Sequence, residues 1–285
     1  MIEGLSIQPM ERGDLAFAAK RTAAEGWVNE TYGEFAGLYA HDPQGCFIAR
    51  IGDQPVGMCF ATAYIASGFI GELIVIPEMR QRGIGAALLN HAVSYLHRRG
   101  CRTVYLDGVD AVVSLYERNG FRQICRSLRL FGHIPRRSHP QVRVMAESDL
   151  AEVSRLDQQA FGDDRIFFLE QRWQRFPELC KVMVDQDSIN GYIMGRRAER
   201  LISAGPWVMS APVSDPLPLL ESLANEAGDT TIAIGILESN SLAVQLARSM
   251  GMEERGEGVW RMALGPDDDL GRSSQCLAIG TAGKG

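Results

Sequence analysis

The chain has 285 residues, of which 46% are hydrophobic and 22% are charged. These fractions are typical of a globular protein and exclude a disordered, collagen-like or coiled-coil chain, and the length predicts about two domains. The 29 basic and 35 acidic residues give a net charge of −6. This balance argues against a dedicated nucleic-acid or anionic-membrane binder, because such proteins need a basic face. It favours a neutral or cationic small-molecule partner.

Targeting signals and cysteine pairs are not evident in the sequence. We find no apolar run of about 18 residues, so no membrane-spanning helix is predicted. The first residues, MIEGLSIQPMERGDL, lack the basic flank and apolar stretch of a signal peptide, so the cytoplasm is the expected location. The six cysteines form no C-x-x-C pair, which predicts reduced, mostly buried thiols and no metal site.

The first half alternates short apolar stretches, which are typical of strands, with stretches of helical period. Asp14 can cap the first helix, and Gly100 ends the third. The predicted strands are Ser6–Gln8, Cys46–Ile51, Val56–Ile65, Phe69–Ile76, Thr103–Leu106 and Phe121–Leu130. The predicted helices are Asp14–Glu25, Thr31–His41, Ile84–Arg99 and Val112–Arg118.

A polar segment with two prolines, residues 132–140, reads as a linker. It predicts two domains, residues 1–132 and 141–285, and the order of strands and helices recurs after it. The predicted strands there are Val142–Met145, Lys181–Asp185, Ile189–Arg196, Leu201–Met209, Thr231–Ile236, Val259–Leu264 and Gln275–Ile279. The predicted helices are Leu150–Phe161, Ile166–Phe176, Leu217–Ala227 and Ser241–Met250. A period of about 135 residues indicates duplication of a whole domain rather than a solenoid.

The segment Glu72–Leu89 contains the residues that indicate a function most clearly. It places a strand and a short loop with Arg80 and Arg82 before a helix that opens on Gly83 and Gly85. The first helical turn leaves backbone N–H groups unpaired, and the helix dipole adds positive charge there. Glycines let an anion approach these amides. The pattern predicts a pyrophosphate site.

The neighbouring residues narrow the choice of pyrophosphate. A P-loop needs Gly-Lys-[Ser/Thr] entering a helix, and no predicted helix follows Gly283-Lys284. A dinucleotide fold needs a third small residue where Leu88 stands and an acidic residue about 20 residues further on, whereas the next strand, Thr103–Leu106, has no acidic residue until Asp107. Coenzyme A therefore fits the loop better than a nucleoside triphosphate or NAD.

At this point the residues resemble a known family. Arg80-x-x-Gly83-x-Gly85-Ala86 resembles the R/Q-x-x-G-x-G/A loop of GNAT-type N-acetyltransferases. Leu73–Pro77 is similar to the central strand of that superfamily, and Ser114–Phe121 to its L-Y-x-x-x-G-F segment. The resemblance covers about residues 5–130. The second half looks like the degenerate GNAT repeat of tandem GNAT proteins, through Phe161–Arg165, Gly205–Trp207 and the Arg261-Met262-x-x-Gly265 segment.

The resemblance implies an α/β (α+β) fold of two tandem GNAT-like domains. Each would have a mixed, mostly antiparallel sheet with a splayed parallel strand pair and flanking helices. Acetyl-CoA would lie in the splay, with its pantetheine on the backbone of the central strand, its thioester carbonyl polarised near Ile76, and its pyrophosphate on the loop amides. The implied cofactor-binding residues are Ile74, Val75, Ile76, Arg80, Gln81, Arg82, Gly83, Ile84, Gly85 and Ala86.

The resemblance also implies direct attack by an amine, with no covalent enzyme intermediate. Tyr116 matches the general-acid tyrosine, and an unperturbed phenol titrates near pH 10. Glu72 and Glu25 are both candidates for the base. Glu25, Trp27 and Tyr32 are expected to line the acceptor pocket.

Two departures from the family pattern matter. Val109 stands where the family often has an asparagine that contacts the cofactor. In the second half Asn240 is kept, but Ala247 replaces the tyrosine and residues 211–218, with three prolines and Asp215, replace the glycine loop. Because prolines lack N–H donors, we expect the second half not to bind coenzyme A in the usual way.

The sequence therefore predicts an acetyl-CoA-dependent N-acetyltransferase for a small-molecule amine, with no nucleic-acid or membrane partner. The alternative is a non-catalytic acyl-CoA-binding or sensor protein, favoured by Val109. An O-acyltransferase or an enzyme for longer acyl chains stays open, as do monomer and homodimer. The identity of the acceptor is not encoded in any motif.

Overall fold

The structure is a computed structural model that describes all residues except 1–2, 28–29, 187, 199–200, 257 and 267–268. The chain forms two compact units. The first contains residues 1–123, residues 262–267 and Lys284. The second contains residues 124–261, residues 268–283 and Gly285.

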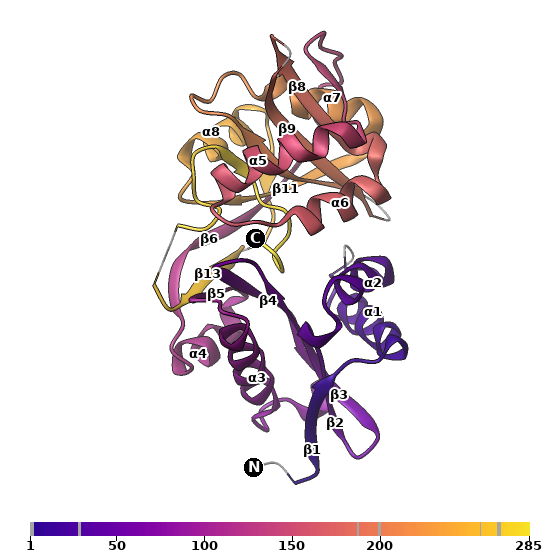
Figure 1. The fold of residues 1–285 in the computed structure, drawn as a ribbon, viewed down its shortest axis with the longest axis vertical. Helices are drawn as coiled ribbons and strands as arrows, with labels where there is room; N and C mark the ends of the chain where they lie inside the picture. Colours follow the sequence, from indigo (N-terminus) through magenta and orange to yellow (C-terminus); the bar gives the residue numbers. More distant parts are fainter. Residues whose placement is uncertain (1–2, 28–29, 187, 199–200, 257, 267–268) are drawn as a thin grey trace. The chain divides into compact units, whose positions relative to one another are not determined.

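The first unit is a sheet with helices on both faces. Figure 1 shows α3 and α4 on one side of this sheet and α1 and α2 on the other. Its strands run in the order β1-β2-β3-β4-β5. They are β1 (Leu5–Pro9), β2 (Cys46–Ile51), β3 (Gln54–Ala63), β4 (Ser67–Val75) and β5 (Thr103–Gly108). The helices are α1 (Leu15–Ala24), α2 (Tyr32–His41), α3 (Ile84–Arg98) and α4 (Asp110–Arg118).

Strand β4 separates from its neighbour β5 part of the way along its length. It is antiparallel to β3 but parallel to β5, and the parallel ladder runs only from the Ser67–Thr103 pair to the Ile70–Leu106 pair. Opposite β3 the register shifts where Glu72 lies, and Glu72 has a φ of 49°. An extra residue of this kind bends a strand and increases its twist. The carboxyl half of β4 therefore runs on without a ladder to β5.

The second unit repeats this arrangement. Its strands run in the order β6-β11-β10-β9-β8-β7, and β10 and β11 are the parallel pair. The strands are β6 (Arg122–Gly132), β7 (Val142–Val144), β8 (Cys180–Asp185), β9 (Ser188–Arg197), β10 (Leu201–Met209), β11 (Thr231–Leu237), β12 (Glu253–Glu254), β13 (Val259–Leu264) and β14 (Cys276–Ala278). The helices are α5 (Leu150–Phe161), α6 (Ile166–Arg175), α7 (Leu217–Ala227) and α8 (Ser241–Ser249).

Two apolar clusters fill the two faces of the second sheet. One joins Leu219 and Leu223 of α7 to Ala243 of α8, and the other joins Val153 of α5 to Phe168 of α6. Each cluster also contains buried strand residues. Helices therefore cover both faces of this sheet, as in the first unit.

The predicted fold class is confirmed: this is an α+β protein with mixed, mostly antiparallel pairing of its strands and one parallel pair in each unit. Every predicted helix and strand is present, the strand at 275–279 included. The sequence missed β12 and five short 3-10 turns. Residues 133–139, in the predicted linker, carry no regular structure.

The compact units divide the chain at other places than the predicted domain boundary at residue 132. Strand β6 has most of its residues in the second unit, where it pairs with β11 from Ser127–Leu237 to Gly132–Ile232. Residues 262–267, which follow the start of β13, count with the first unit. A residue pattern identifies a strand but not its hydrogen-bonding partner, which explains the difference.

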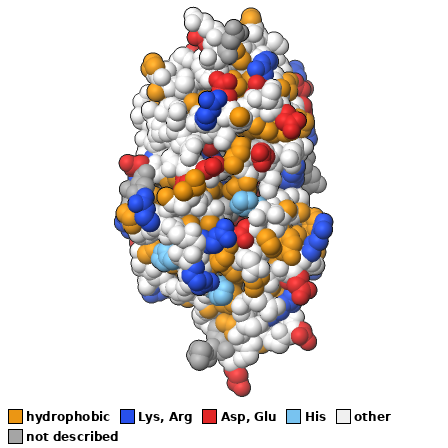
Figure 2. All heavy atoms as spheres, in the orientation of Figure 1, with side chains coloured by type: hydrophobic (Ala, Val, Ile, Leu, Met, Phe, Trp, Pro, Cys, Tyr) orange, Lys and Arg blue, Asp and Glu red, His pale blue; other side chains and the backbone are white. Residues whose placement is uncertain are grey.

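Charges are spread over the surface. On the face drawn in Figure 2, acidic and basic side chains are interspersed. None of the helices within the described part of the chain combines the length and the apolar character needed to cross a bilayer.

Candidate functional site

The N-terminus of α3 forms the predicted anion loop. Gly83 is the N-cap residue with a φ of 85°, and no side chain caps this end of α3. Gln81 also has a positive φ, of 61°. Gln81, Arg82 and Gly83 are exposed. An exposed loop therefore leads into a helix N-terminus without a side-chain cap, which is the kind of place where proteins bind anions.

Arg80 has partners within the protein. Its Nε donates to the Val75 carbonyl oxygen at 2.9 Å, and its guanidinium forms an ion pair with Glu25. Glu25 follows the last residue of α1. Arg80 therefore ties the loop to the end of α1, whereas the sequence predicted that it faces a phosphate and that Glu25 faces the acceptor.

The backbone of β4 corrects one prediction. The Ile76 N–H donates to the Val56 carbonyl oxygen at 3.0 Å, so it is not available to polarise a thioester. Because backbone groups alternate along a strand, Ile74 faces β3 in the same way. Leu73 and Val75 then direct their backbone groups away from β3, and the Val75 carbonyl oxygen already accepts from Arg80 Nε. The backbone groups that do not face β3 are thus those of Leu73 and Val75, not those of Ile74 and Ile76.

Glu72 is buried at the bulge of β4, with 4% of its side chain exposed. Its Oε1 lies 3.6 Å from Nζ of Lys284. The same ammonium lies 3.7 Å from Oε2 of Glu30. All three residues belong to the first unit. Two carboxylates and one ammonium thus meet beside the end of the β4–β5 ladder.

The turn between α1 and α2 brings Glu30 to this place. The Thr22 hydroxyl donates to the Glu30 carbonyl oxygen at 2.9 Å, and the Trp27 N–H donates to the Thr22 carbonyl oxygen at 2.9 Å. Trp27 and Tyr32 are 38% and 46% exposed. Both aromatic side chains are therefore exposed to solvent.

Tyr116 is buried on α4 over the end of β5. A Cβ on Gly108 would lie 2.5 Å from Cε2 of Tyr116, so the ring needs glycine there. The Phe121 ring packs edge-on at 6.1 Å. Burial, and then the charge of Cys59, raise the pKa of Tyr116 to about 12. The phenol is therefore protonated at neutral pH and able to donate.

The thiols near this site are poor nucleophiles. Burial, with smaller effects of Asp42 and Glu72, raises the pKa of Cys46 to about 12. Burial also raises the pKa of Cys59, followed by the charges of Cys46 and Glu72. Since the thiolate is the reactive form, both sulfurs are inert at neutral pH. Among the described residues, no three His, Cys, Asp or Glu side chains are placed to hold a metal ion.

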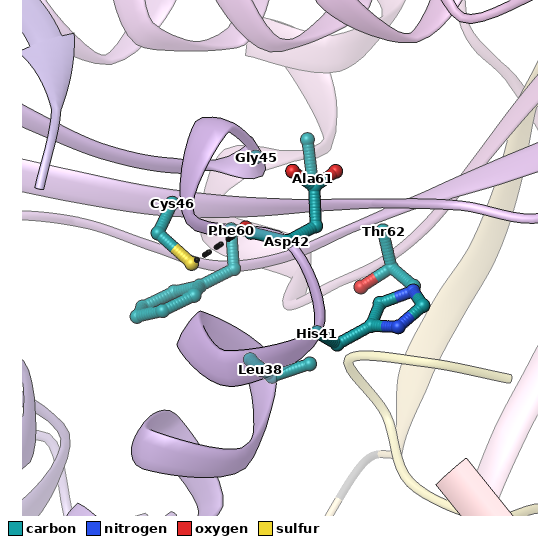
Figure 3. Close-up of a pocket in the computed structure, with 8 residues that line it drawn as sticks. All are labelled: Leu38, His41, Asp42, Gly45, Cys46, Phe60, Ala61 and Thr62. Atoms are coloured by element: carbon teal, nitrogen blue, oxygen red, sulfur yellow. Dashed lines mark hydrogen bonds between the residues drawn. The ribbon is translucent and has the colours of Figure 1, made fainter. Parts of the chain in front are cut away.

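A small cavity lies elsewhere in the first unit, between α2 and β3 (Figure 3). It measures about 10 Å³, which is barely room for one water molecule. His41 and Thr62 point into it, and the Cys46 thiol donates to the Asp42 carbonyl oxygen at its edge. A cavity of this size does not hold a substrate.

The splay in the second unit is occupied by the chain itself. Strand β14 pairs with β10 at Trp207–Ala278, and the Ile279 N–H donates to the Gly235 carbonyl oxygen of β11 at 2.9 Å. Asn240 caps α8 and donates to the Cys276 carbonyl oxygen at 2.9 Å. Asn240 thus holds β14 in place.

Sequence reasoning missed Glu30 and Lys284. The candidate residues around the first turn were Glu25, Trp27 and Tyr32, and Lys284 was considered only as part of a Gly-Lys pair. An acidic residue between two predicted helices is a usable signal for Glu30. No local pattern points to Lys284, because its neighbours in space are distant in sequence.

Comparisons with known proteins identify the family. Residues 14–121 match the model of the Acetyltransferase (GNAT) family, and residues 153–275 match that of an Acetyltransferase (GNAT) domain. The chain belongs to the GNAT acetyltransferase family and carries two GNAT domains in tandem.

Two curated relatives align with part of the chain. An uncharacterized N-acetyltransferase of Methanocaldococcus jannaschii is 34% identical over 99 residues, which are 31% of this chain and 44% of that protein. A glucosamine 6-phosphate N-acetyltransferase of Trypanosoma brucei brucei is 32% identical over 95 residues, 33% of this chain and 63% of that protein. The matched region thus spans less than two thirds of either relative.

Solved structures share the whole architecture. A putative acetyltransferase from Pyrococcus horikoshii superposes over 100% of this chain and 97% of its own, with a TM-score of 0.83 at 23% identity. A tandem GNAT protein from the clavulanic acid biosynthesis pathway superposes over 93% of this chain and 100% of its own, with a TM-score of 0.64 at 15% identity. At these identities the likeness concerns the fold.

Proposed function

We propose that the protein is an acetyl-CoA-dependent N-acetyltransferase that acts on a small-molecule amine, with its reaction centre in the first unit. Coenzyme A supplies the acetyl thioester. The amides of the loop and of the first turn of α3, from Gln81 to Ala86, hold the pyrophosphate, and the backbone of Leu73 and Val75 holds the pantetheine.

The observation that carries this proposal is the combination at β4. A buried carboxylate, Glu72, lies at a bulge where the parallel ladder to β5 has just ended, and the uncapped helix α3 follows the same strand. A protonated Tyr116 lies over the end of β5. A candidate base, a candidate cofactor cradle and a candidate acid on β4, α3 and α4 support the proposal.

Glu72 and Tyr116 transfer protons and form no covalent bond to the substrate carbon. The acceptor ammonium gives a proton to the Glu72 carboxylate, directly or through water, and the free amine attacks the thioester carbonyl carbon. A C–N bond forms and the C–S bond breaks. Tyr116 gives its proton to the leaving thiolate, and the nitrogen then loses its second proton, which restores the Tyr116 phenol through water. The products are an amide and the coenzyme A thiol, and the proton on Glu72 is released to solvent.

A screen of amines with acetyl-CoA, read by release of free thiol, tests the proposal. At least one small amine should release thiol at a rate that depends on the concentration of the protein and of the amine. A protein that binds acetyl-CoA but releases no thiol with any amine class would instead be the sensor that Val109 leaves open.

We also propose that the second unit does not bind coenzyme A. Strand β14 lies between β10 and β11 where a pantetheine would run, and residues 211–218 supply three prolines where the first unit has amide donors. Isothermal titration should give one equivalent of coenzyme A per chain, and two equivalents would reject this proposal.

A further inference from the structure

Lys284 brings a buried cation to Glu72. Its side chain is 2% exposed, and its Nζ lies within 4 Å of both Glu72 and Glu30. A lysine is almost never this buried unless it is paired. The ammonium is therefore a built part of the first unit, at the carboxylate that the proposed reaction uses as a base.

The backbone around Lys284 fixes the position of this ammonium. The Tyr64 hydroxyl donates to the Lys284 carbonyl oxygen. Tyr64 and Lys284 belong to the same unit, so this bond ties the backbone of Lys284 to the strands that carry Glu72.

We propose that Lys284 is a positioning residue for the acetyl transfer, which holds Glu72 ionised and directed toward the acceptor side of β4. This inference rests on the proposed function. Glu72 and Glu30 are like charges at one place, and such a pair disfavours ionisation of both groups. An ammonium within 4 Å of each carboxylate reverses that effect, so Glu72 accepts a proton only when the acceptor delivers it.

Other groups near this cluster are neutral or bonded elsewhere. Cys46 of β2 and Cys59 of β3 interact electrostatically with Glu72, and burial keeps both as neutral thiols. Tyr64 bonds to the backbone of Lys284. Arg80, one of the two arginines of the loop, is paired with Glu25. Lys284 is a cation that the structure places within 4 Å of Glu72.

Carbon-13 NMR of the glutamate side-chain carboxyls tests the inference without turnover, with Glu72→Gln to assign the Glu72 signal. In Lys284→Met, the Glu72 titration midpoint should rise by about one pH unit or more. Lys284→Arg should keep the wild-type midpoint, and Lys20→Met, which removes an exposed ammonium on α1, should leave it unchanged. An unchanged midpoint in Lys284→Met would overturn the inference.

A second variant keeps the test decisive if Lys284→Met does not fold. Glu30→Gln removes the like charge and should move the Glu72 midpoint downward, opposite in sign to the loss of Lys284. A midpoint that does not fall in Glu30→Gln would show that these groups are not coupled, and would also overturn the inference.

The pH profile of the reaction gives the activity readout. A higher Glu72 midpoint leaves less carboxylate at low pH, so the acidic limb of kcat/KM should move to higher pH in Lys284→Met. For a midpoint shift of one unit the loss should approach about tenfold only at pH values below the wild-type midpoint, and it should shrink as the pH rises. A uniform loss at every pH, or a gain in kcat, would contradict a positioning role. If no amine is acetylated by the wild-type protein, the proposed function is contradicted. The carboxyl titration still tests separately whether Lys284 keeps Glu72 ionised.

Discussion

At the scale of single residues, the site depends on two buried side chains, a carboxylate and a phenol. Glu72 has a carboxylate at a bulge, and Tyr116 has a phenol whose pKa burial raises to about 12. A glycine, Gly108, gives the Tyr116 ring its room over β5. An acid with a high pKa stays protonated at neutral pH and still transfers its proton to a thiolate in a low-dielectric site.

Replacing Tyr116 by phenylalanine removes the proton donor and little volume. We expect kcat to fall about a hundredfold, within the range for general acids, with the Kd for coenzyme A changed less than threefold. Stopped-flow thiol release and isothermal titration measure the two quantities. In the wild type, no loss of rate from ionisation of Tyr116 should occur below about pH 11, because the phenol stays protonated below its raised pKa.

Tyr95→Phe is the matched control. It removes a phenol from α3 that donates to Asp42, away from β4 and β5. Stability should fall by about 1–3 kcal/mol, because Asp42 loses a partner, and kcat should stay unchanged. Equal losses of kcat in both variants would contradict the role of Tyr116 as the acid.

At the scale of elements, the uncapped N-terminus of α3 decides where the cofactor binds. The sequence predicted this loop because glycines at the start of a helix form a local pattern. It did not predict that Arg80 pairs with Glu25, because that contact depends on where the end of α1 lies. The direction of the backbone groups after the bulge cannot be predicted from a hydrophobic pattern either. For this reason the sequence pointed to Ile76, whereas the backbone groups that do not face β3 are those of Leu73 and Val75.

Gly83→Ala and Gly100→Ala form a matched pair at the two ends of α3. Both glycines have a positive φ, of 85° and 91°, so alanine should cost each variant about 1–2 kcal/mol of stability. Gly83→Ala should also weaken coenzyme A binding about tenfold, because it changes the backbone that presents the amides. Gly100→Ala, with open space around its Cβ, should bind normally. Isothermal titration and urea unfolding separate the two effects, and equal Kd values would contradict the location of the anion site.

At the scale of the whole molecule, the two units share one arrangement of helices and strands but differ in detail. Asp14 accepts from the Glu11 N–H and pairs with Arg50, and Asp149 accepts from the Ala146 N–H and pairs with Arg143. The repeat in the sequence predicted this duplication. It did not predict that β14 fills the second splay, because the pairing of strands that are distant in sequence is not encoded locally.

The capping aspartate of the second unit gives a pH dependence of stability. The Arg143 hydrogen bonds, aided by the Ala146 N–H, hold the pKa of Asp149 below its ordinary value. The ionised Asp149 therefore contributes fully to the stability of the fold above about pH 4. This contribution is lost as the pH falls through the pKa of Asp149 in the folded state, which is lower than in the unfolded state. Asp149→Asn should cost about 1 kcal/mol at pH 7, discounted because Arg143 is half exposed, and less at pH 3.

Urea unfolding of this variant at both pH values measures the effect. Asp229→Asn serves as the control, since Asp229 is 95% exposed and should change stability by less than about 0.5 kcal/mol. A cost that stays the same at pH 7 and pH 3 would contradict the ionised pair at Asp149.

Hydrogen exchange with and without acetyl-CoA, resolved to single segments, tests the central claim most directly. We expect protection of the amides at residues 81–86 on addition of acetyl-CoA, and no change at residues 211–218. Exchange at 81–86 that acetyl-CoA leaves unchanged, or protection that appears at 211–218 instead, would contradict the account.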